Sequence, residues 1–108
     1  MKKRFVVMVD ITTEKWNADF HRYLKSIGAG WWHWLSRAWL IVISNPEITI
    51  CTVRDAATNA FPGSHLLVLE LTGGDTWGGF GPGGTKKGQK NMFTWLHNNW
   101  KSEDDIPF

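Results

Sequence analysis

Apolar and polar positions alternate along the first two thirds of the chain in blocks that predict strands and helices. The near-continuous apolar run from about Arg4 to Ile11 is typical of a central strand. A helical pattern follows it, then two short strand-like runs, a second helical pattern and a last apolar run from His65 to Leu71. The predicted order of elements is therefore strand, helix, strand, strand, helix, strand.

The stretch Trp31–Ser44 is the most distinctive part of this pattern, because it places four tryptophans and a β-branched run around one polar break. It predicts a hairpin that turns at Ser36-Arg37 and has an unusually aromatic first arm. A hairpin between two helices, with a strand on either side, is typical of a ferredoxin-like βαββαβ sandwich. In that α+β fold, four antiparallel strands carry both helices on one face.

Both predicted helices have recognisable ends. Thr12 or Thr13 is placed to cap the first helix, and Gly28 and Gly30 stop it. For the second helix, Asn45 offers a capping side chain and Pro46 suits the first helical position. The positions expected to be buried are Trp16, Phe20, Tyr23, Leu24 and Ile27 in the first helix and Ile50, Val53, Ala57 and Phe61 in the second.

The composition changes abruptly after residue 71, where eight glycines lie within residues 72–88. A loop of this length in a compact domain is usually functional or disordered. We expect a single domain over residues 1–108, made of a βαββαβ core (1–71), a glycine-rich loop (72–88), a C-terminal amphipathic helix (89–101) that carries Met92, Trp95, Leu96 and Trp100, and a polar tail (102–108).

Charge, hydropathy and cysteine content limit the kinds of partner and compartment that we expect for the chain. The formal net charge is +2, which permits an anionic partner without requiring one. The first apolar run ends at Asp10, too early for an export signal, and no run approaches the roughly 20 residues of a membrane span. We expect a soluble cytoplasmic protein. Its single cysteine, Cys51, excludes an internal disulfide and is expected to be a small core residue rather than a nucleophile.

Asp10 is the first candidate for chemistry, because it interrupts an apolar strand near its end, where a carboxylate is costly unless it is exposed or paired. One carboxylate from each subunit of a two-fold dimer can hold a divalent metal such as Mg²⁺ or Mn²⁺. Asp10 would then be both the metal ligand and the catalytic residue of a nuclease. The alternative is a carboxylate that caps the turn before Thr12.

The histidines and serines give little catalytic signal. His21, His33, His65 and His97 show no metal-type spacing, and there is no cluster of cysteines or carboxylates near them in sequence. No serine lies in a G-x-S-x-G context. The sequence therefore gives no reason to expect a bound cofactor, apart from the metal of the nuclease hypothesis.

The glycine-rich loop contains a G-x-G-x-x-G spacing at Gly79, Gly81 and Gly84. The match is weak, because a dinucleotide loop leaves a strand directly and opens a helix. The generic possibility is that glycine amides cradle a phosphate or a nucleic-acid backbone, and the alternative is a plain flexible loop. The expected ligand contacts are Gly79, Gly81, Gly84, Lys86, Lys87 and Lys90, with further charge from Lys2, Lys3 and Arg4.

The tryptophans of the hairpin predict an interface. Trp31, Trp32 and Trp34 alternate along a short strand, so both of its faces are aromatic. One face should meet the helices, and the other should meet a partner, because large exposed apolar patches are uncommon on monomers. We expect a homodimer or partner interface here, extended by Trp77 and Phe80; stacking on nucleobases is the alternative.

The chain resembles a family of small ferredoxin-like proteins described as SinR-like, which is related in fold to the small subunit of the CRISPR spacer-acquisition complex. The resemblance lies in three stretches: Phe5–Ile11, Trp31–Ile41 and Leu66–Gly73. It implies a βαββαβ fold and a homodimer, and it matches Asp10 to an acidic residue that has been proposed to bind metal in CRISPR-associated relatives. The glycine-rich insertion and the extra tryptophans depart from the family pattern.

Three functions follow from these features. The first is a non-catalytic homodimeric binding module for nucleic acid or a phosphate-bearing ligand. The second is a phage or mobile-element protein that binds and inhibits a host defence component, with Trp77, Phe80 and the hairpin aromatics as anchors. The third is a metal-dependent nuclease that uses Asp10.

Overall fold

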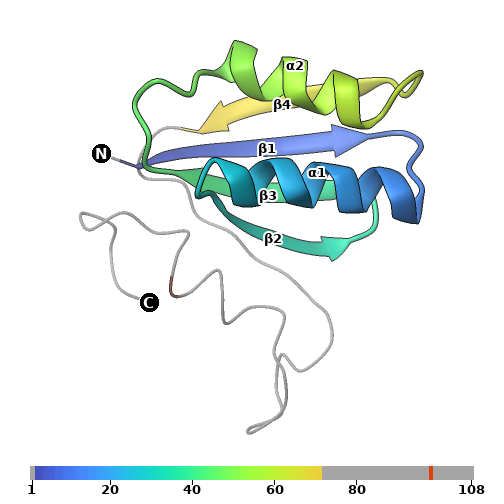
Figure 1. Cartoon of the computed structure of the whole chain (residues 1–108), viewed down its shortest axis with the longest axis horizontal. Coiled ribbons are helices and arrows are strands. Elements are labelled where there is room, and N and C mark those ends of the chain that lie inside the picture. The colour runs from blue at the N-terminus through green and yellow to red at the C-terminus, as the bar shows by residue number, and fades with distance from the viewer. Residues whose placement is uncertain (1, 72–97, 99–108) are drawn as a thin grey trace, which may run out of the picture.

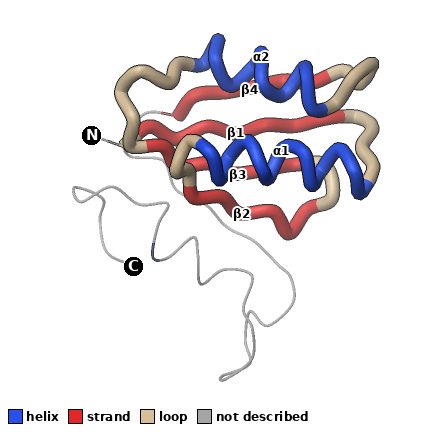
Figure 2. The backbone as a smooth tube through the Cα atoms, viewed as in Figure 1, coloured by secondary structure: helices blue, strands red, loops and turns tan. Residues whose placement is uncertain are grey.

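The structure is a computed structural model that describes residues 2–71 and residue 98. The described chain forms four strands and two helices (Figure 1; Figure 2). Their bounds are β1 Lys3–Val9, α1 Glu14–Ser26, β2 Gly30–Leu35, β3 Ala38–Ile43, α2 Ile50–Ala60 and β4 Leu66–Leu71. The glycine-rich loop, the C-terminal helix and the tail expected over residues 72–108 lie outside the described residues, except for Asn98.

The four strands form one antiparallel sheet in the order β2-β3-β1-β4. Both helices lie on the same side of this sheet (Figure 1). The expected α+β fold with a four-stranded antiparallel sheet and two helices is therefore confirmed, and the arrangement is compatible with a ferredoxin-like fold. The strands β2 and β4 are the two edges, and a register shift interrupts β2 between Trp32 and Leu35.

The ends of α1 follow the sequence closely. The Thr13 hydroxyl accepts a hydrogen bond from the Trp16 backbone N–H at 3.1 Å, which satisfies one of the free donors of the first turn. At the other end Gly28 has a φ of +72°, a left-handed conformation that favours glycine. The Thr13 cap and the glycine stop were both expected.

The start of α2 differs from the prediction. The helix begins at Ile50, and its cap is Thr49, whose side chain accepts from the Thr52 N–H while the Thr52 side chain accepts from the Thr49 N–H. This reciprocal pair satisfies two backbone donors together. Asn45 instead closes the turn before it, by accepting from the Glu47 N–H at 2.9 Å. The expectation that Asn45 caps the helix at Pro46 was wrong, because the asparagine bonds within its own turn.

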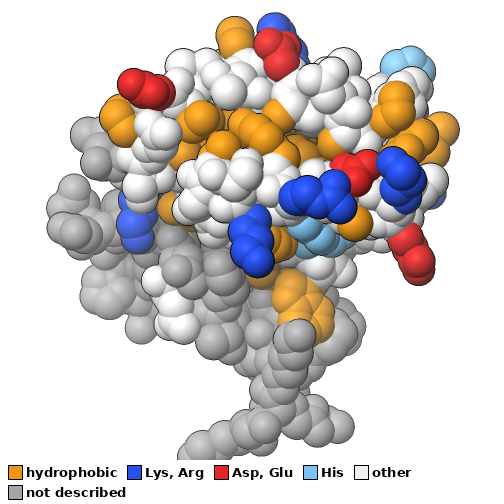
Figure 3. Space-filling model, viewed as in Figure 1, with side chains coloured by type: hydrophobic (Ala, Val, Ile, Leu, Met, Phe, Trp, Pro, Cys, Tyr) orange, Lys and Arg blue, Asp and Glu red, His pale blue; other side chains and the backbone are white. Residues whose placement is uncertain are grey.

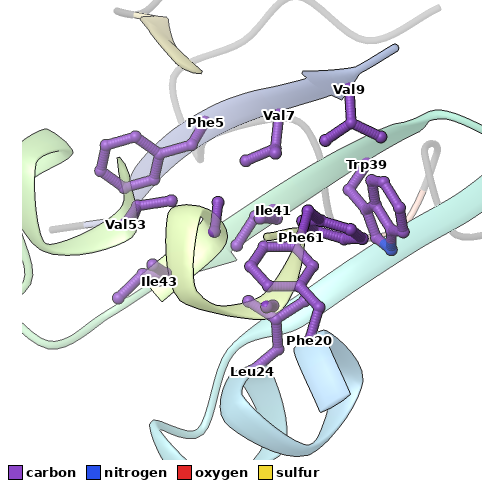
Figure 4. Close-up of a cluster of buried hydrophobic side chains, with 12 residues drawn as sticks. Phe5, Val7, Val9, Phe20, Leu24, Trp39, Ile41, Ile43, Val53 and Phe61 are labelled. Carbon is purple, nitrogen blue, oxygen red and sulfur yellow. The ribbon is translucent and has the colours of Figure 1, made fainter. Parts of the chain in front are cut away.

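The core lies between the helices and the inner face of the sheet (Figure 4). Three aromatic rings from three separate elements meet at its centre: Phe20 of α1, Trp39 of β3 and Phe61 at the end of α2. Their ring centroids are 5.1 to 5.4 Å apart, in edge-on or tilted arrangements that suit aromatic pairs. All three side chains are at most 1% exposed.

Two predicted core positions on α2 are on the surface. Cys51 is exposed, because the buried side of α2 is set by Val53, Ala57 and Ala60, and a residue two positions before Val53 points away from that side. Ile50 is 36% exposed, because it stands at the first position of the helix, where the core ends. The expectation of a buried cysteine was therefore wrong, whereas Val53, Ala57 and Phe61 are buried as predicted.

Candidate functional site

Asp10 lies just after β1 and joins it to the start of β4. One carboxylate oxygen, Oδ1, accepts hydrogen bonds from the Ser64 hydroxyl at 2.7 Å and from the His65 backbone N–H at 2.8 Å. The other, Oδ2, lies 3.0 Å from Nδ1 of the His65 ring. The Ser64 hydroxyl oxygen also accepts from the Ile11 backbone N–H at 3.1 Å. We call Asp10, Ser64 and His65 the carboxylate clasp.

The contacts of the clasp give the Asp10 carboxylate a structural role. The Ser64 hydrogen bond, followed by the contacts with His65, holds the pKa of Asp10 below its usual value, so the charged form is favoured. Serine and histidine both bond to the aspartate, whereas in a nucleophile–base–acid relay the histidine lies between the other two. Within the described residues no group of three or more His, Cys, Asp or Glu side chains could hold a metal ion. This geometry favours the turn-capping alternative for Asp10.

Two histidines that sequence reasoning passed over come together with two tryptophans. The His33 ring stacks on Trp39 with centroids 4.0 Å apart and planes 3° apart, and the His21 ring stacks on Trp31 at 5.2 Å and 13°. The Trp39 indole N–H donates to Nε2 of His21 at 2.9 Å. We call these four residues the histidine–tryptophan cluster. It connects α1 to β2 and β3.

Protonation of the cluster is opposed by its surroundings. Burial lowers the pKa of both histidines, and for His21 the neighbouring His33 adds to the effect. Nδ1 of His33 lies 3.0 Å from the Ala38 carbonyl oxygen, which only accepts, so that nitrogen carries the proton of the neutral ring. His21 accepts the Trp39 hydrogen bond only while its Nε2 is unprotonated. The Trp39 hydrogen bond therefore requires an unprotonated Nε2 on His21, whereas at His33 burial favours the neutral ring and the Ala38 carbonyl partly opposes it.

The sequence contains part of the pattern that forms the histidine–tryptophan cluster, but local spacing alone does not predict it. Trp31 and His33 are two residues apart on one strand, so their side chains share a face. His21 is separated from them by the end of α1 and a turn, and only the packing of α1 on the sheet brings it near.

The side of the sheet that faces the helices differs in character from the opposite side. Figure 3 views the helix side, where hydrophobic side chains gather between the two helices and Lys and Arg side chains line α1. On the opposite side the strands present a second, largely apolar set of side chains, which we call the helix-free face. Its members are Arg4, Val6 and Met8 of β1, Trp32 and Leu35 of β2, Ala38, Leu40 and Val42 of β3, and Leu67, Leu69 and Leu71 of β4.

The three predicted interface tryptophans of the hairpin divide between these two faces. Trp31 packs against the core on the helix side, Trp32 belongs to the helix-free face, and Trp34 lies within the register shift between Trp32 and Leu35. Both faces of β2 are thus aromatic, as the alternation predicts. Part of the helix-free face is strongly exposed: Met8 is 36% exposed, Leu67 53% and Leu69 42%. We call these three residues the open patch.

Two residues of the N-terminal basic cluster, which consists of Lys2, Lys3 and Arg4, are not free to contact a ligand because they make contacts within the fold or are buried. The Lys3 ammonium donates to the carbonyl oxygens of Pro46 at 3.1 Å and of Ile48 at 2.8 Å, and so ties β1 to the loop before α2. The Arg4 side chain is only 4% exposed. Lys2 is the exposed member of the cluster.

A shallow groove of about 530 Å³ runs between α2 and β4 and includes Cys51, Arg54, Thr58 and His65 among its lining residues. Its arginine does not offer an unbalanced charge, because the Arg54 guanidinium lies 3.0 Å from the Asp55 carboxylate. The predicted ligand and interface residues Gly79, Gly81, Gly84, Lys86, Lys87, Lys90, Trp77 and Phe80 lie outside the described residues.

A comparison of the chain with family models, curated proteins and solved structures found no match in any of the three. What the chain does is therefore inferred from its own residues. Neither α1 nor α2, the helices in residues 2–71, is long and apolar enough to cross a membrane.

Replacing Asp10 tests the clasp against a metal site. We expect Asp10→Asn to lower the midpoint of thermal unfolding at pH 7, because it removes the charge that holds two elements together. Since the pKa of Asp10 is lowered by folding, its contribution is present above the ordinary value of 3.8, and the difference from the parent should shrink as the pH falls below it. Asp55→Asn, on the exposed side of α2, is the control. A rise in the parent's midpoint with Mg²⁺ or Mn²⁺ that Asp10→Asn abolishes would support a metal site instead.

The histidine–tryptophan cluster predicts a loss of stability in mild acid. Because the pKa values of His21 and His33 are lowered by folding, the unfolded chain binds more protons than the folded chain just below pH 6.5. The free energy of unfolding should therefore fall as the pH drops from 7.5 through 6.5. Urea unfolding of the parent and of His21→Gln/His33→Gln measures this, since the double variant should lose much of the slope. An equal slope in both proteins would contradict the prediction.

Proposed function

We propose that this chain is a non-catalytic, homodimeric binding module whose subunit interface is the open patch on the helix-free face. The observation that carries the proposal is the exposure of Met8, Leu67 and Leu69 side by side on the two adjacent strands β1 and β4. Large contiguous apolar surface on a soluble domain is usually an interaction site. An aromatic strand lies at the far edge of the same face.

The sheet beneath the open patch is regular. Met8 lies opposite Leu67, and Val6 lies opposite Leu69, with no register shift along the β1–β4 pair. Leu67 and Leu69 are two positions apart on β4 and therefore point to the same side. β4 is also an edge strand without lysine or proline, and its charged residue, Glu70, lies opposite the core residue Phe5 and so is not on the helix-free face. These features suit a flat, apolar contact between two copies.

The carboxylate clasp supports a binding role rather than a nuclease activity for Asp10. The Asp10 oxygens already accept three contacts from Ser64 and His65. A metal at this position would compete with these contacts, so the nuclease hypothesis requires the clasp to open. The binding hypothesis leaves it intact.

The ligand that we propose is a nucleic acid or another phosphate-bearing molecule. Lys3 donates its hydrogen bonds to backbone carbonyls of the same chain, and Arg4 is buried. We therefore assign the ligand contacts mainly to Lys86, Lys87 and Lys90. Clustered lysines contact phosphate backbones through charge rather than through base sequence. Kinship with the SinR-like family is part of the same proposal and is supported by the βαββαβ order of the described elements.

Charged substitutions in the open patch test the dimer. We expect the parent to sediment as a dimer and Leu67→Glu/Leu69→Glu to sediment as a monomer, because the dimer would have to bury two carboxylates from each subunit. Ile11→Glu is the control, since Ile11 is 57% exposed but lies after β1, outside the sheet. Sedimentation velocity over a wide concentration range measures the outcome. A parent that stays monomeric at every concentration rules the dimer out.

Salt-dependent binding tests the ligand. We expect the parent to retard the migration of DNA or RNA at low salt and to lose affinity as the salt concentration rises. The triple variant Lys86→Gln/Lys87→Gln/Lys90→Gln should reduce the slope of log K against log salt by about one per lysine that contacts phosphate. Lys15→Gln/Lys25→Gln/Arg37→Gln removes the same charge elsewhere and is the control. Titration followed by mobility shift measures both. If the parent binds neither nucleic acid nor nucleotides at low salt, the assignment fails.

A further inference from the structure

The outer edge of β4 has open backbone groups, because within residues 2–71 β4 has a neighbouring strand on one side only. The Asp10 backbone N–H donates to the His65 carbonyl at 3.0 Å, which makes this opposed pair a hydrogen-bonded one. Hydrogen-bonded and non-hydrogen-bonded pairs alternate along an antiparallel ladder. The residues of β4 whose N–H and C=O groups point away from β1 are therefore Leu66, Val68 and Glu70.

A groove lies beside this edge, on the side of the sheet that carries the helices. It has a volume of about 530 Å³ and lies between α2 and β4. Its wall on α2 is formed by Ile50, Cys51, Arg54 and Thr58. In Figure 1, α2 runs along β4 on the side away from β1. A chain segment placed against the edge of β4 would therefore have α2 beside it.

An extended segment fits the edge and the groove at once. Side chains alternate along a strand, so a strand added at this edge would direct one set toward the groove and the other set toward the helix-free side. The first set would meet Leu66, Val68 and Ile50, which is 36% exposed. The second set would meet Leu67 and Leu69, which are 53% and 42% exposed. Apolar surface is therefore available to both sets.

We infer that the β4 edge and the groove bind an extended peptide segment of another protein, which adds to the sheet as a further strand antiparallel to β4. Outward N–H and C=O groups are satisfied in register by another extended backbone, which neither a helix nor a small ligand supplies. Antiparallel pairing is the more stable of the two directions. The inference goes beyond the proposed function, because the proposed dimer uses the helix-free face and this site uses the edge and the helix side.

The side chains of the edge specify the chemistry of the peptide. Apolar surface on both sides of the added strand favours alternating β-branched residues. Glu70 is exposed and is the charged residue of β4, so it favours a lysine or arginine directly opposite it on the added strand. The expected partner is a short, extended, β-branched segment with a basic residue at its amino-terminal end.

Amide hydrogen exchange on the full chain tests the inference. The probe is the synthetic peptide acetyl-Lys-Val-Val-Thr-Ile-Lys-amide, whose first residue lies opposite Glu70 in the antiparallel register. In the parent alone, the amides of Leu66, Val68 and Glu70 should exchange faster than those of Leu67 and Leu69, which bond to β1. Peptide at ten times its dissociation constant should slow the three outward amides about tenfold, because about one molecule in eleven stays free. Outward amides that are slow without peptide, or that peptide does not slow, would overturn the inference.

Two N-methylated peptides are the matched controls for strand addition. The N–H groups of the third and fifth peptide residues face Val68 and Leu66, so methylating both should abolish the protection. The N–H groups of the second and fourth residues face away from β4, so methylating these should preserve it. Equal effects of the two modified peptides would show that backbone pairing is not the basis of binding, which would overturn the inference.

Cys51 allows the groove to be blocked without a change in the sheet, because it is exposed and lines the groove. Alkylation of Cys51 with pyrenyl maleimide should weaken peptide binding. The same label at Lys25→Cys on α1, in a Cys51→Ser background, is the control and should leave binding unchanged. Equal binding to the two labelled proteins would contradict a site that includes the groove.

Met8→Glu separates this site from the dimer. Met8 lies on β1, one strand in from the edge, so the variant should sediment as a monomer and keep the protection given by the peptide. Loss of that protection in Met8→Glu would place the peptide on the helix-free face and overturn the inference. Protection of the outward amides that rises with protein concentration in the absence of peptide would assign the edge to a second copy and overturn it as well.

Discussion

The constraint that governs this structure is a four-stranded sheet with two apolar faces, of which the two helices in residues 2–71 cover one. The helices bury one face around Phe20, Trp39 and Phe61, whose rings bring together α1, β3 and the end of α2. The alternation of side chains along each strand places a second apolar set on the other face. The helices therefore cover one face of the sheet, and within residues 2–71 no helix covers the other.

The helix-free face meets this constraint in two ways. Its corner near the start of β1 is buried, and its other side, over β1 and β4, is open. Exposure differs even within one row of paired residues, since Trp32 is 6% exposed whereas Leu69, in the same row, is 42% exposed. The chemistry of Asp10 fits the same view, since a carboxylate that anchors the end of β1 to β4 stiffens the surface on which a partner would rest.

Sequence patterns specified the elements well and the polar contacts poorly. Strands, the Thr13 cap and the turn at Ser36-Arg37 follow from local periodicity and turn chemistry, and the structure contains them. The cap of α2 was misplaced because Asn45 and Thr49 both favour a helix start, and only the reciprocal bond with Thr52 decides between them. The partners of Asp10 lie 54 and 55 residues away, beyond the range of any local pattern. His21 and His33 were passed over for the same reason, because packing brings them together rather than spacing.

The antiparallel pairing of β1 with β4 has a practical consequence for handling the protein. It places the first residues of the chain beside the point where β4 ends, since Arg4 lies opposite Leu71. An affinity tag or fusion partner attached at the amino terminus therefore emerges next to the exit of the remaining chain and crowds that end of the sheet. The hairpin turn at Ser36-Arg37, exposed and at the opposite end of β3, is the place where an insertion would disturb the domain least.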